Sequence, residues 1–304
     1  MSRAPVLAIV VHGGAWSIPL AQREAHRRGC IAAAELGWRA LEQGGSALDA
    51  VVAALRALED DPTFDAGTGS VLAADGRVQL DAGLMDGRTL KIGAVANVRT
   101  VRSPIVLARE VLEHSAHHLL VGPGAEAFAR ARGLEEVDPS RFVVERERAR
   151  HDDFLAGRLG AGSDFQGHDT VGAVALDAHG QLAAGNSTGG VAFSLPGRVG
   201  DAPLPGVGYA ADSRHGGVAC TGWGEHILRV ALASRALAAL ERGESANAAA
   251  RSAASVLQAR VDGQAGLIVL DRTGEVGLAH TTECLAHAFR VTGMRCAEGG
   301  TAVR

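Results

Sequence analysis

The chain has 304 residues, of which 47% are hydrophobic and 21% are charged, a composition that excludes intrinsic disorder over most of its length. Its formal net charge of −4, from 34 acidic and 30 basic residues, gives no electrostatic reason to expect nucleic acid or an anionic membrane as a partner. The length suits one large domain or two smaller ones, since domains run to roughly 100–200 residues.

The sequence also bears on the compartment. No run of about 18 apolar residues without charge occurs, so we expect no transmembrane helix. The apolar run at 5–11 is short and leads into His12 without a small-residue cleavage site, which indicates a buried strand rather than a signal peptide. The cysteines are far apart and form no CxxC motif, which favours reduced thiols in a cytoplasmic protein over a disulfide framework. They are Cys30, Cys220, Cys284 and Cys296.

The first half of the chain alternates between strands and helices. Gly44-Gly45 ends one helix, Ser46 caps the next, and Pro62 stops it. Residues 133–168 carry the weakest pattern, with a charged run at 145–150 that is typical of a solvated helix face. Strands are predicted at 5–11, 70–73, 78–81 and 88–98, and helices at 22–43, 46–59, 103–113 and 123–132.

A Gly-rich connector at 157–167 precedes an abrupt change to strand character at Thr170. The second half then repeats the order of strands followed by paired helices, which indicates layered α and β structure. Strands are predicted at 170–176, 181–185, 207–211, 217–220, 265–270, 275–279 and 287–292, and helices at 224–241 and 244–259.

Thr170 is the most informative residue, because a polar connector leads directly into a hydroxyl at the start of a buried strand. Its hydroxyl could attack the carbonyl of Asp169, and hydrolysis of the resulting ester would leave Thr170 as a new N-terminus. That residue would then hold a nucleophile and, in its α-amine, a base whose pKa is about 7.7–8.0. On the residues alone, an ordinary β-branched strand start is the alternative.

Three further segments carry groups that suit such a nucleophile. If the next strand returns antiparallel, Thr188 comes back near Thr170. Arg198 and Asp201 lie in a loop with Gly and Pro, where they would suit the carboxylate and ammonium of an amino acid, with a surface ion pair as the alternative. The Thr221 hydroxyl and the Gly222 N–H, between a strand and a helix, would suit an oxyanion hole or form a plain turn.

Together these segments resemble the plant-type L-asparaginase/isoaspartyl aminopeptidase family, whose members are N-terminal-nucleophile hydrolases that cleave themselves before a Thr. The resemblance implies a single α+β domain over 1–304, folded as an αββα four-layer sandwich. It also implies mature chains of 1–169 and 170–304 that assemble as a dimer of αβ units. The matching segments are 11–15, 64–69, 80–87, 170–175, 187–190, 196–201 and 221–225.

The resemblance implies the site residues as well. Thr170 would be the nucleophile with Thr188 beside it, and Thr221 with Gly222 would form the oxyanion hole. The substrate would be held by Arg198, Asp201 and Gly224. No cofactor is expected, except that some members bind a structural sodium in a loop. In this chain that loop would comprise Leu58, Glu59, Asp61, Phe64, Ala66 and Thr68.

Some positions depart from the family pattern. Asp169 replaces the Gly that usually precedes the nucleophile, and an Asp-Thr pair resembles the glycosylasparaginase branch. Asp65 stands where many relatives have Asn, and Asn186 replaces a common Thr. Trp223 is bulky, so it would narrow the pocket or stack on a substrate. Residues 282–284 lack the usual Gly after Glu. These departures affect the expected substrate more than the expected chemistry.

The predicted activity is release of L-aspartate from β-aspartyl dipeptides and from L-asparagine, both small-molecule or dipeptide substrates. One alternative is a glycosylasparaginase that cleaves glycosyl-asparagine. Another is a protein that binds amino acids without cleaving itself. Two other motifs are weaker. Residues 113–118 hold three His without a metal-binding pattern, and 185–189 match GxSxG without the helix that a nucleophile elbow requires.

Overall fold

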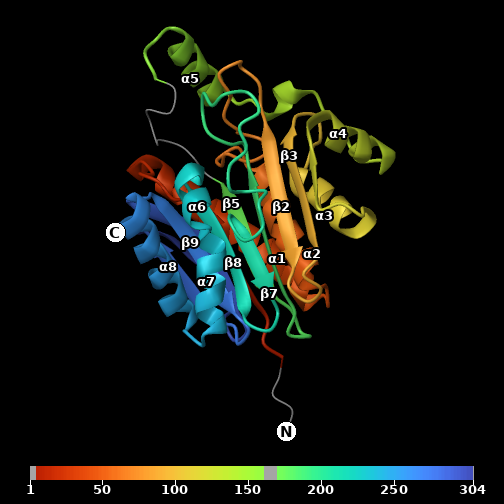
Figure 1. Cartoon of the computed structure of the whole chain (residues 1–304), viewed down its shortest axis with the longest axis vertical. Helices are drawn as coiled ribbons and strands as arrows, with labels where there is room; N and C mark the ends of the chain where they lie inside the picture. The colour runs from red at the N-terminus through yellow and green to blue at the C-terminus, as the bar shows by residue number, and fades with distance from the viewer. Residues whose placement is uncertain (1–4, 161–169, 304) are drawn as a thin grey trace.

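The computed structural model describes residues 5–160 and 170–303. The described chain forms two β-sheets flanked by helices (Figure 1), so the predicted mixture of layered α and β structure is confirmed. Within it, no helix is both long and apolar enough to cross a membrane. The helices are α1 (Leu20–Glu42), α2 (Ala47–Asp60), α3 (Pro104–His114), α4 (Gly122–Ala131), α5 (Glu145–Leu155), α6 (Gly224–Val230), α7 (Leu232–Glu241) and α8 (Ala246–Val261), with a 3₁₀ turn at Pro139–Phe142.

The larger sheet has eight strands and the smaller has four. Neighbouring strands pair antiparallel, except that β3 and β4 are parallel. The larger sheet runs in the order β12 (Glu298–Val303), β11 (Cys284–Val291), β1 (Ala8–Gly13), β5 (Val171–Leu176), β6 (Leu182–Thr188), β2 (Leu80–Asp86), β3 (Ile92–Val98) and β4 (Leu119–Val121). The smaller runs β10 (Val276–His280), β9 (Ala265–Asp271), β8 (Gly216–Gly222) and β7 (Tyr209–Asp212).

Strand β1 shows why the central strands are apolar on both faces. Successive side chains of a strand point to opposite faces of its sheet. Ile9 and Val11 join the core beneath α1 and α2, whereas Val10 joins the core between the two sheets. A third apolar core fills the space between the smaller sheet and α7 and α8, which cover its outer face (Figure 1). Burial on both faces therefore requires the unbroken apolar run of β1.

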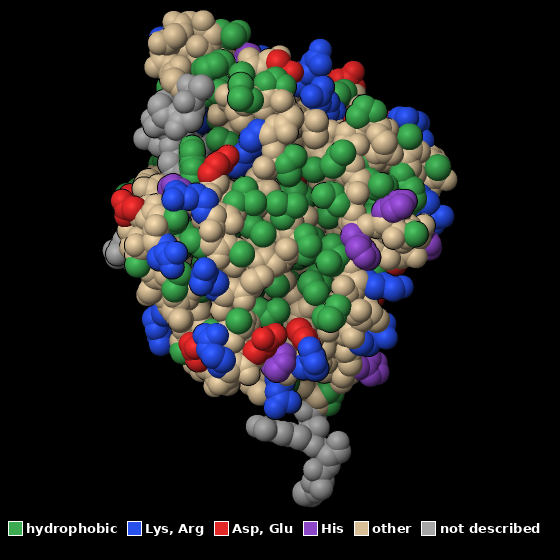
Figure 2. All heavy atoms as spheres, in the orientation of Figure 1, with side chains coloured by type: hydrophobic (Ala, Val, Ile, Leu, Met, Phe, Trp, Pro, Cys, Tyr) green, Lys and Arg blue, Asp and Glu red, His purple; other side chains and the backbone are tan. Residues whose placement is uncertain are grey.

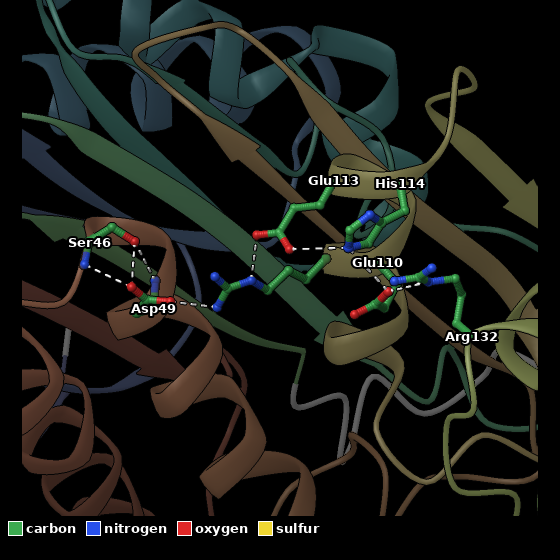
Figure 3. A network of polar contacts seen from close by, with 7 residues as sticks. Ser46, Asp49, Glu110, Glu113, His114 and Arg132 are labelled. Atoms are coloured by element: carbon green, nitrogen blue, oxygen red, sulfur yellow. Dashed lines mark hydrogen bonds and ion pairs between the residues drawn. The ribbon is translucent and has the colours of Figure 1, made fainter.

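Local capping fixes the start of α2 as predicted. The Ser46 Oγ accepts a hydrogen bond from the Asp49 N–H, and the Asp49 carboxylate accepts one from the Ser46 N–H, which forms a capping box. Asp49 also pairs with Arg109 of α3 at 2.6 Å, so the cap ties two helices together. Figure 3 shows how this network continues to Glu110, Glu113, His114 and Arg132.

Several predicted elements were wrong. Residues 70–73 form a loop instead of a strand, because the Val71 N–H donates to the Asp65 side chain at 2.9 Å rather than to a neighbouring strand. The helix predicted at 224–241 breaks at Ala231, which has a left-handed φ of 51°. Strands β4 and β12 were not predicted. They are the two edges of the larger sheet, and β12 is rich in Gly and polar residues.

The charged run at 145–150 does begin a helix, α5, but it is not simply a solvated face. Glu147 is buried and pairs with Arg146 at 2.9 Å and with Arg150 at 3.0 Å. A buried carboxylate needs such partners, because an unpaired buried charge is strongly destabilising. The four cysteines form no disulfide in the structure, and Cys296 is exposed whereas the other three are buried.

Candidate active site

Thr170 and Thr188 meet at one end of the larger sheet. Thr170 stands directly before β5, Thr188 ends β6, and both are buried. The Thr170 hydroxyl donates a hydrogen bond to the Thr188 Oγ1 at 3.0 Å, and the Gly190 N–H donates to the same oxygen at 3.1 Å. The antiparallel register explains the approach, since Val171 lies opposite Ser187. Asp169, on the other side of the predicted cleavage point, lies outside the described residues.

A buried histidine lies behind this pair. His12 of β1 contacts the Thr170 backbone and the Asn186 side chain, and burial lowers the pKa of its imidazole to about 3. The ring is therefore neutral at physiological pH. It fits because Gly172 has no side chain: a Cβ there would lie 2.1 Å from His12 Nε2 and 2.4 Å from Asn186 Oδ1. Asn186 in turn donates to the carbonyls of Gly208 and Cys220, which joins β6 to the smaller sheet.

Thr221 and Gly222 end β8, a strand that packs against β5 and β6. The Thr221 hydroxyl is fully buried and has no hydrogen-bond partner among the described residues. Such a group is uncommon in native proteins, so this hydroxyl can donate a hydrogen bond to a bound substrate. Gly222 has a φ of 125°, and a Cβ there would lie 2.5 Å from the Ala265 Cα, so the position requires glycine.

The loop after β6 brings Arg198 and Asp201 to the start of α6. Arg198 binds Glu225 with two hydrogen bonds, from Nε and Nη2, each 2.9 Å long. Asp201 is buried, and its Oδ2 has no partner in the described part of the chain. A Cβ on Gly224 would lie 2.7 Å from Arg198 Nη2 and 2.8 Å from Asp201 Oδ1. Glycine at 224 therefore leaves space between the two charged groups.

Comparison with known proteins agrees with this arrangement. A family model described as asparaginase matches residues 5–296. The chain belongs to this asparaginase family. It is 43% identical over 282 residues to an isoaspartyl peptidase/L-asparaginase of Bos taurus, covering 92% of each chain. It is 42% identical to an isoaspartyl peptidase of Escherichia coli (94% of this chain, 93% of the relative). It is 41% identical to a plant-type L-asparaginase of Pyrococcus horikoshii (97% and 100%).

The site of this asparaginase-family chain contains an acidic residue to which no role was assigned from the sequence. Asp81 of β2 lies opposite Thr188, is buried, and accepts hydrogen bonds from the backbone N–H groups of Asn97, at 2.7 Å, and Gly200. Its carboxylate acts electrostatically on Arg198 and Asp201. Its segment, 80–87, is one of the segments that resemble the family, but only the pairing of β2 with β6 shows that Asp81 lies opposite Thr188.

Burial dominates the electrostatics of these acids. It raises the pKa of Asp201 to about 7, although the positive charge of Arg198 opposes the shift. It also raises the pKa of Asp81 to about 7, against the hydrogen bond from Asn97. With Glu225, three carboxyl groups surround one guanidinium, so the cluster lacks positive charge. This imbalance favours a ligand that brings a cationic group.

The segment predicted to hold sodium begins in the last turn of α2 and continues into the loop after it. The Glu59 carbonyl accepts from the Thr68 N–H at 2.8 Å, and the Asp61 carbonyl from the Phe64 N–H at 3.2 Å. Each of these two carbonyls has a second lone pair, and backbone carbonyl oxygens are hard donors of the kind that such an ion uses. Leu58 and Ala66 are buried in the core beside this loop.

The Glu59 side chain has a separate role on the far side of β6. It accepts hydrogen bonds from the Ser187 hydroxyl at 2.7 Å, from the Ile105 N–H at 2.9 Å and from Ser103. Burial nevertheless raises the pKa of its carboxyl to about 7. Glu59 therefore ties α2 to the strand that ends at Thr188, and this contact had no signal in the sequence.

Two other groups of ionisable residues lie away from the site. His114 pairs with Glu110 and Glu113 at 3.7 and 3.9 Å at the end of α3 (Figure 3). Asp212, His215 and Glu241 come close enough to share an ion, but the Asp212 carboxylate already binds the Arg214 guanidinium. Neither group contacts the threonines.

Proposed function

We propose that this asparaginase-family chain is a self-processing amidohydrolase that releases L-aspartate from β-aspartyl dipeptides and from L-asparagine. The observation that carries the proposal is the buried hydrogen bond between Thr170 and Thr188, at the start of a strand in a chain whose relatives are isoaspartyl peptidases and L-asparaginases. The two packed sheets with outer helices support the αββα sandwich of N-terminal-nucleophile hydrolases as the finer fold.

Maturation would break the chain between Asp169 and Thr170. The Thr170 hydroxyl adds to the Asp169 carbonyl, and the peptide bond to the Thr170 nitrogen breaks, which leaves an ester. Water then hydrolyses the ester to give the Asp169 carboxylate and a free Thr170 with its hydroxyl and amine. The products are chains 1–169 and 170–304, as the N-terminal threonine mechanism requires.

In turnover, the Thr170 amine takes the proton of the Thr170 hydroxyl while Oγ1 adds to the side-chain carbonyl of the substrate. The developing oxyanion is stabilised by the Thr221 hydroxyl and the Gly222 N–H, and Thr188 orients the nucleophile. The amine then returns its proton to the leaving nitrogen, so ammonia or an amino acid departs and an aspartyl ester remains. Water hydrolyses this ester and frees L-aspartate.

The head of the substrate would bind between Arg198 and Asp201. Its α-carboxylate pairs with the guanidinium and its ammonium with Asp201, so the ammonium supplies the positive charge that the acidic cluster lacks. Gly224 leaves space for this head. Asparagine and β-aspartyl dipeptides share the head, and they differ only beyond the bond that breaks.

The second candidate is a glycosylasparaginase, which the Asp169-Thr170 pair favours. Trp223, half-buried as the N-cap of α6, offers a ring on which a sugar could stack. The third is an amino-acid-binding protein that never cleaves itself. Two fragments on a denaturing gel would exclude the third, and one uncut chain near 31.2 kDa would support it.

Assembly, ion binding and location belong to the same proposal. We expect a dimer of αβ units, and Figure 2 shows apolar side chains gathered across the middle of one face, which would suit such an association. Sedimentation would give its mass. The carbonyls of Leu58, Glu59, Asp61, Phe64, Ala66 and Thr68 would hold a sodium that stabilises their loop. A cytoplasmic location agrees with the free thiols.

The decisive experiment is an assay of the purified protein against asparagine, a β-aspartyl dipeptide and glycosyl-asparagine, with N-terminal sequencing of the same sample. We expect aspartate from the first two and a fragment that begins at Thr170. Active protein without that fragment would reject the mechanism. Turnover of glycosyl-asparagine alone would establish the second candidate.

A further inference from the structure

Helix α5 is unusual because its sequence does not explain why it is held in place. Its residues, ERERARHDDFL, form no apolar stripe of the kind that docks a surface helix. Figure 1 shows α5 at one end of the molecule, beside the loop that follows β6. Two side chains, Arg146 near its start and Phe154 near its end, attach it to two separate segments of the proposed active site.

The first attachment is to the loop after α2. The Arg146 guanidinium donates hydrogen bonds to the carbonyls of Pro62, Thr63 and Gly69. In the same loop the Asp65 carbonyl accepts from the Gly189 N–H at 2.9 Å, directly after Thr188. The contact is tight, because a Cβ on Gly189 would lie 2.3 Å from Asp65 Oδ1. Arg146 therefore supports the loop against which the Thr188 segment rests.

The second attachment is to the segment that leads to Arg198. Phe154 stacks on Phe193, with ring centroids 4.5 Å apart and planes 3° from parallel. Phe193 is buried and has a left-handed φ of 59°, which is strained for a bulky side chain and persists only when its surroundings hold it. Its N–H donates to the Leu72 carbonyl at 2.8 Å, and Arg150 of α5 lies over its ring. The α5 contacts therefore help to hold this conformation.

We propose that α5 positions both parts of the active site: Arg146 supports the segment of Thr188, and Phe154 supports the loop that carries Arg198 and Asp201. The proposal rests on the function proposed above. It has a consequence for the mature protein, because α5 precedes the proposed break and Phe193 follows it. The stack would then be a noncovalent contact between two chains, and α5 of the first chain would remain part of the working enzyme.

The test compares neighbouring residues of the same helix. Phe154→Ala should raise KM for asparagine roughly three- to tenfold, the range that loss of one aromatic pair allows, with kcat nearly unchanged. Leu155→Ala is the matched control, because Leu155 is 67% exposed. Phe154→Tyr keeps the stack and should restore the original KM. Phe154→Leu keeps apolar burial without stacking, and should fold while retaining most of the KM increase.

Mutation of Arg146 should affect kcat rather than KM. Arg146→Ala should lower kcat about fivefold, the order of effect expected from losing charge-assisted hydrogen bonds, with KM nearly unchanged. Arg148→Ala is its control, since Arg148 lies on the same helix and, within residues 5–160 and 170–303, its ion pair is with Glu145 at 3.3 Å. Equal kinetic effects from Arg146→Ala and Arg148→Ala, or from Phe154→Ala and Leu155→Ala, would overturn the proposal.

Hydrogen exchange separates this proposal from the proposed function, because it needs no turnover. In Phe154→Ala, amides of residues 190–201 should exchange faster than in Leu155→Ala, while β5 and β6 exchange at the original rate. Faster exchange in a protein that turns over none of the substrates would support the positioning role and reject the function. Unchanged exchange at 190–201 would reject the positioning role whatever the activity.

Discussion

The two halves of the proposed site are built differently. Thr170, Thr188 and Thr221 lie at the ends of buried, paired strands, where backbone register sets their positions and the neighbouring His12 is neutral. Arg198 and Asp201 lie in a loop, within a cluster of charges whose carboxyl pKa values burial raises. The positions of the proposed reacting groups thus depend on sheet geometry. Recognition of the substrate head would depend on the conformation of a loop and on the protonation of its carboxyl groups. Mutations and pH should affect the two halves separately.

The largest loss of activity should come from mutation of the threonines at the strand ends. Thr170→Ala removes the proposed nucleophile, so self-cleavage and turnover should both fall below detection, while Thr170→Ser should retain part of each. Intact mass and an asparagine assay measure the two outcomes. If Thr170→Ala turned over asparagine at the original rate, another group would have to perform the chemistry.

Arg198→Ala should weaken substrate capture by the loop and leave the strand-end threonines unaffected. The precursor peptide has no free amino-acid head, so self-cleavage should proceed normally. Capture of asparagine should weaken on the order of 100-fold, because the substrate carboxylate would lose the guanidinium proposed to pair with it. Gel analysis of maturation beside steady-state KM tests both statements. If cleavage failed together with capture, the two halves would not be separable.

pH should act through Asp201. The substrate ammonium prefers the ionised carboxylate, so substrate binding lowers the raised pKa of Asp201 and releases a proton. Capture should therefore be strongest above pH 7 and should weaken up to tenfold per pH unit below it. Measurement of kcat/KM from pH 5 to pH 9 should show this fall in substrate capture below pH 7. In Asp201→Asn the part of this fall that Asp201 causes should disappear along with much of the affinity, which leaves the part set by protonation of the Thr170 amine.

The smallest effect concerns stability and involves Glu59. Its folded pKa of about 7 lies above the ordinary value of 4.5, so the folded state holds the proton more tightly than the unfolded state. The contribution of this protonation to the free energy of unfolding is fully present below pH 4.5 and is lost as pH rises through 7. Glu59→Gln should reduce the difference between melting temperatures at pH 5 and pH 8 by a few degrees. An unchanged difference would place the pH dependence in Asp81 and Asp201.

Local features were predictable from the sequence. Ser46 and Asp49 specify the start of α2 through side chains three residues apart, and Asp177 specifies the β5–β6 turn by accepting from the N–H groups of His179 and Gln181. That hairpin brings Thr188 to Thr170, as expected. These features involve short sequence separations and turn chemistry whose geometry is known in advance.

Features that depend on distant register were not predictable. Asp81 reaches the site because β2 pairs with β6, which lies about a hundred residues away in the chain. The contact of Glu59 with Ser187 and the stack of Phe154 on Phe193 likewise join segments that no local pattern relates. The left-handed φ of Phe193 contradicts its intrinsic preference, so only the surrounding packing could reveal it.

The double hydrogen bond from Arg198 to Glu225 has a consequence for selectivity. The guanidinium already has a carboxylate neighbour in Glu225, so a simple anion meets a cation whose charge is largely neutralised. A ligand that offers only a negative charge must compete with Glu225 and is repelled by two further acids. A zwitterion avoids this repulsion through its ammonium. Free amino acids should therefore displace chloride or acetate from this site with ease, even at high salt.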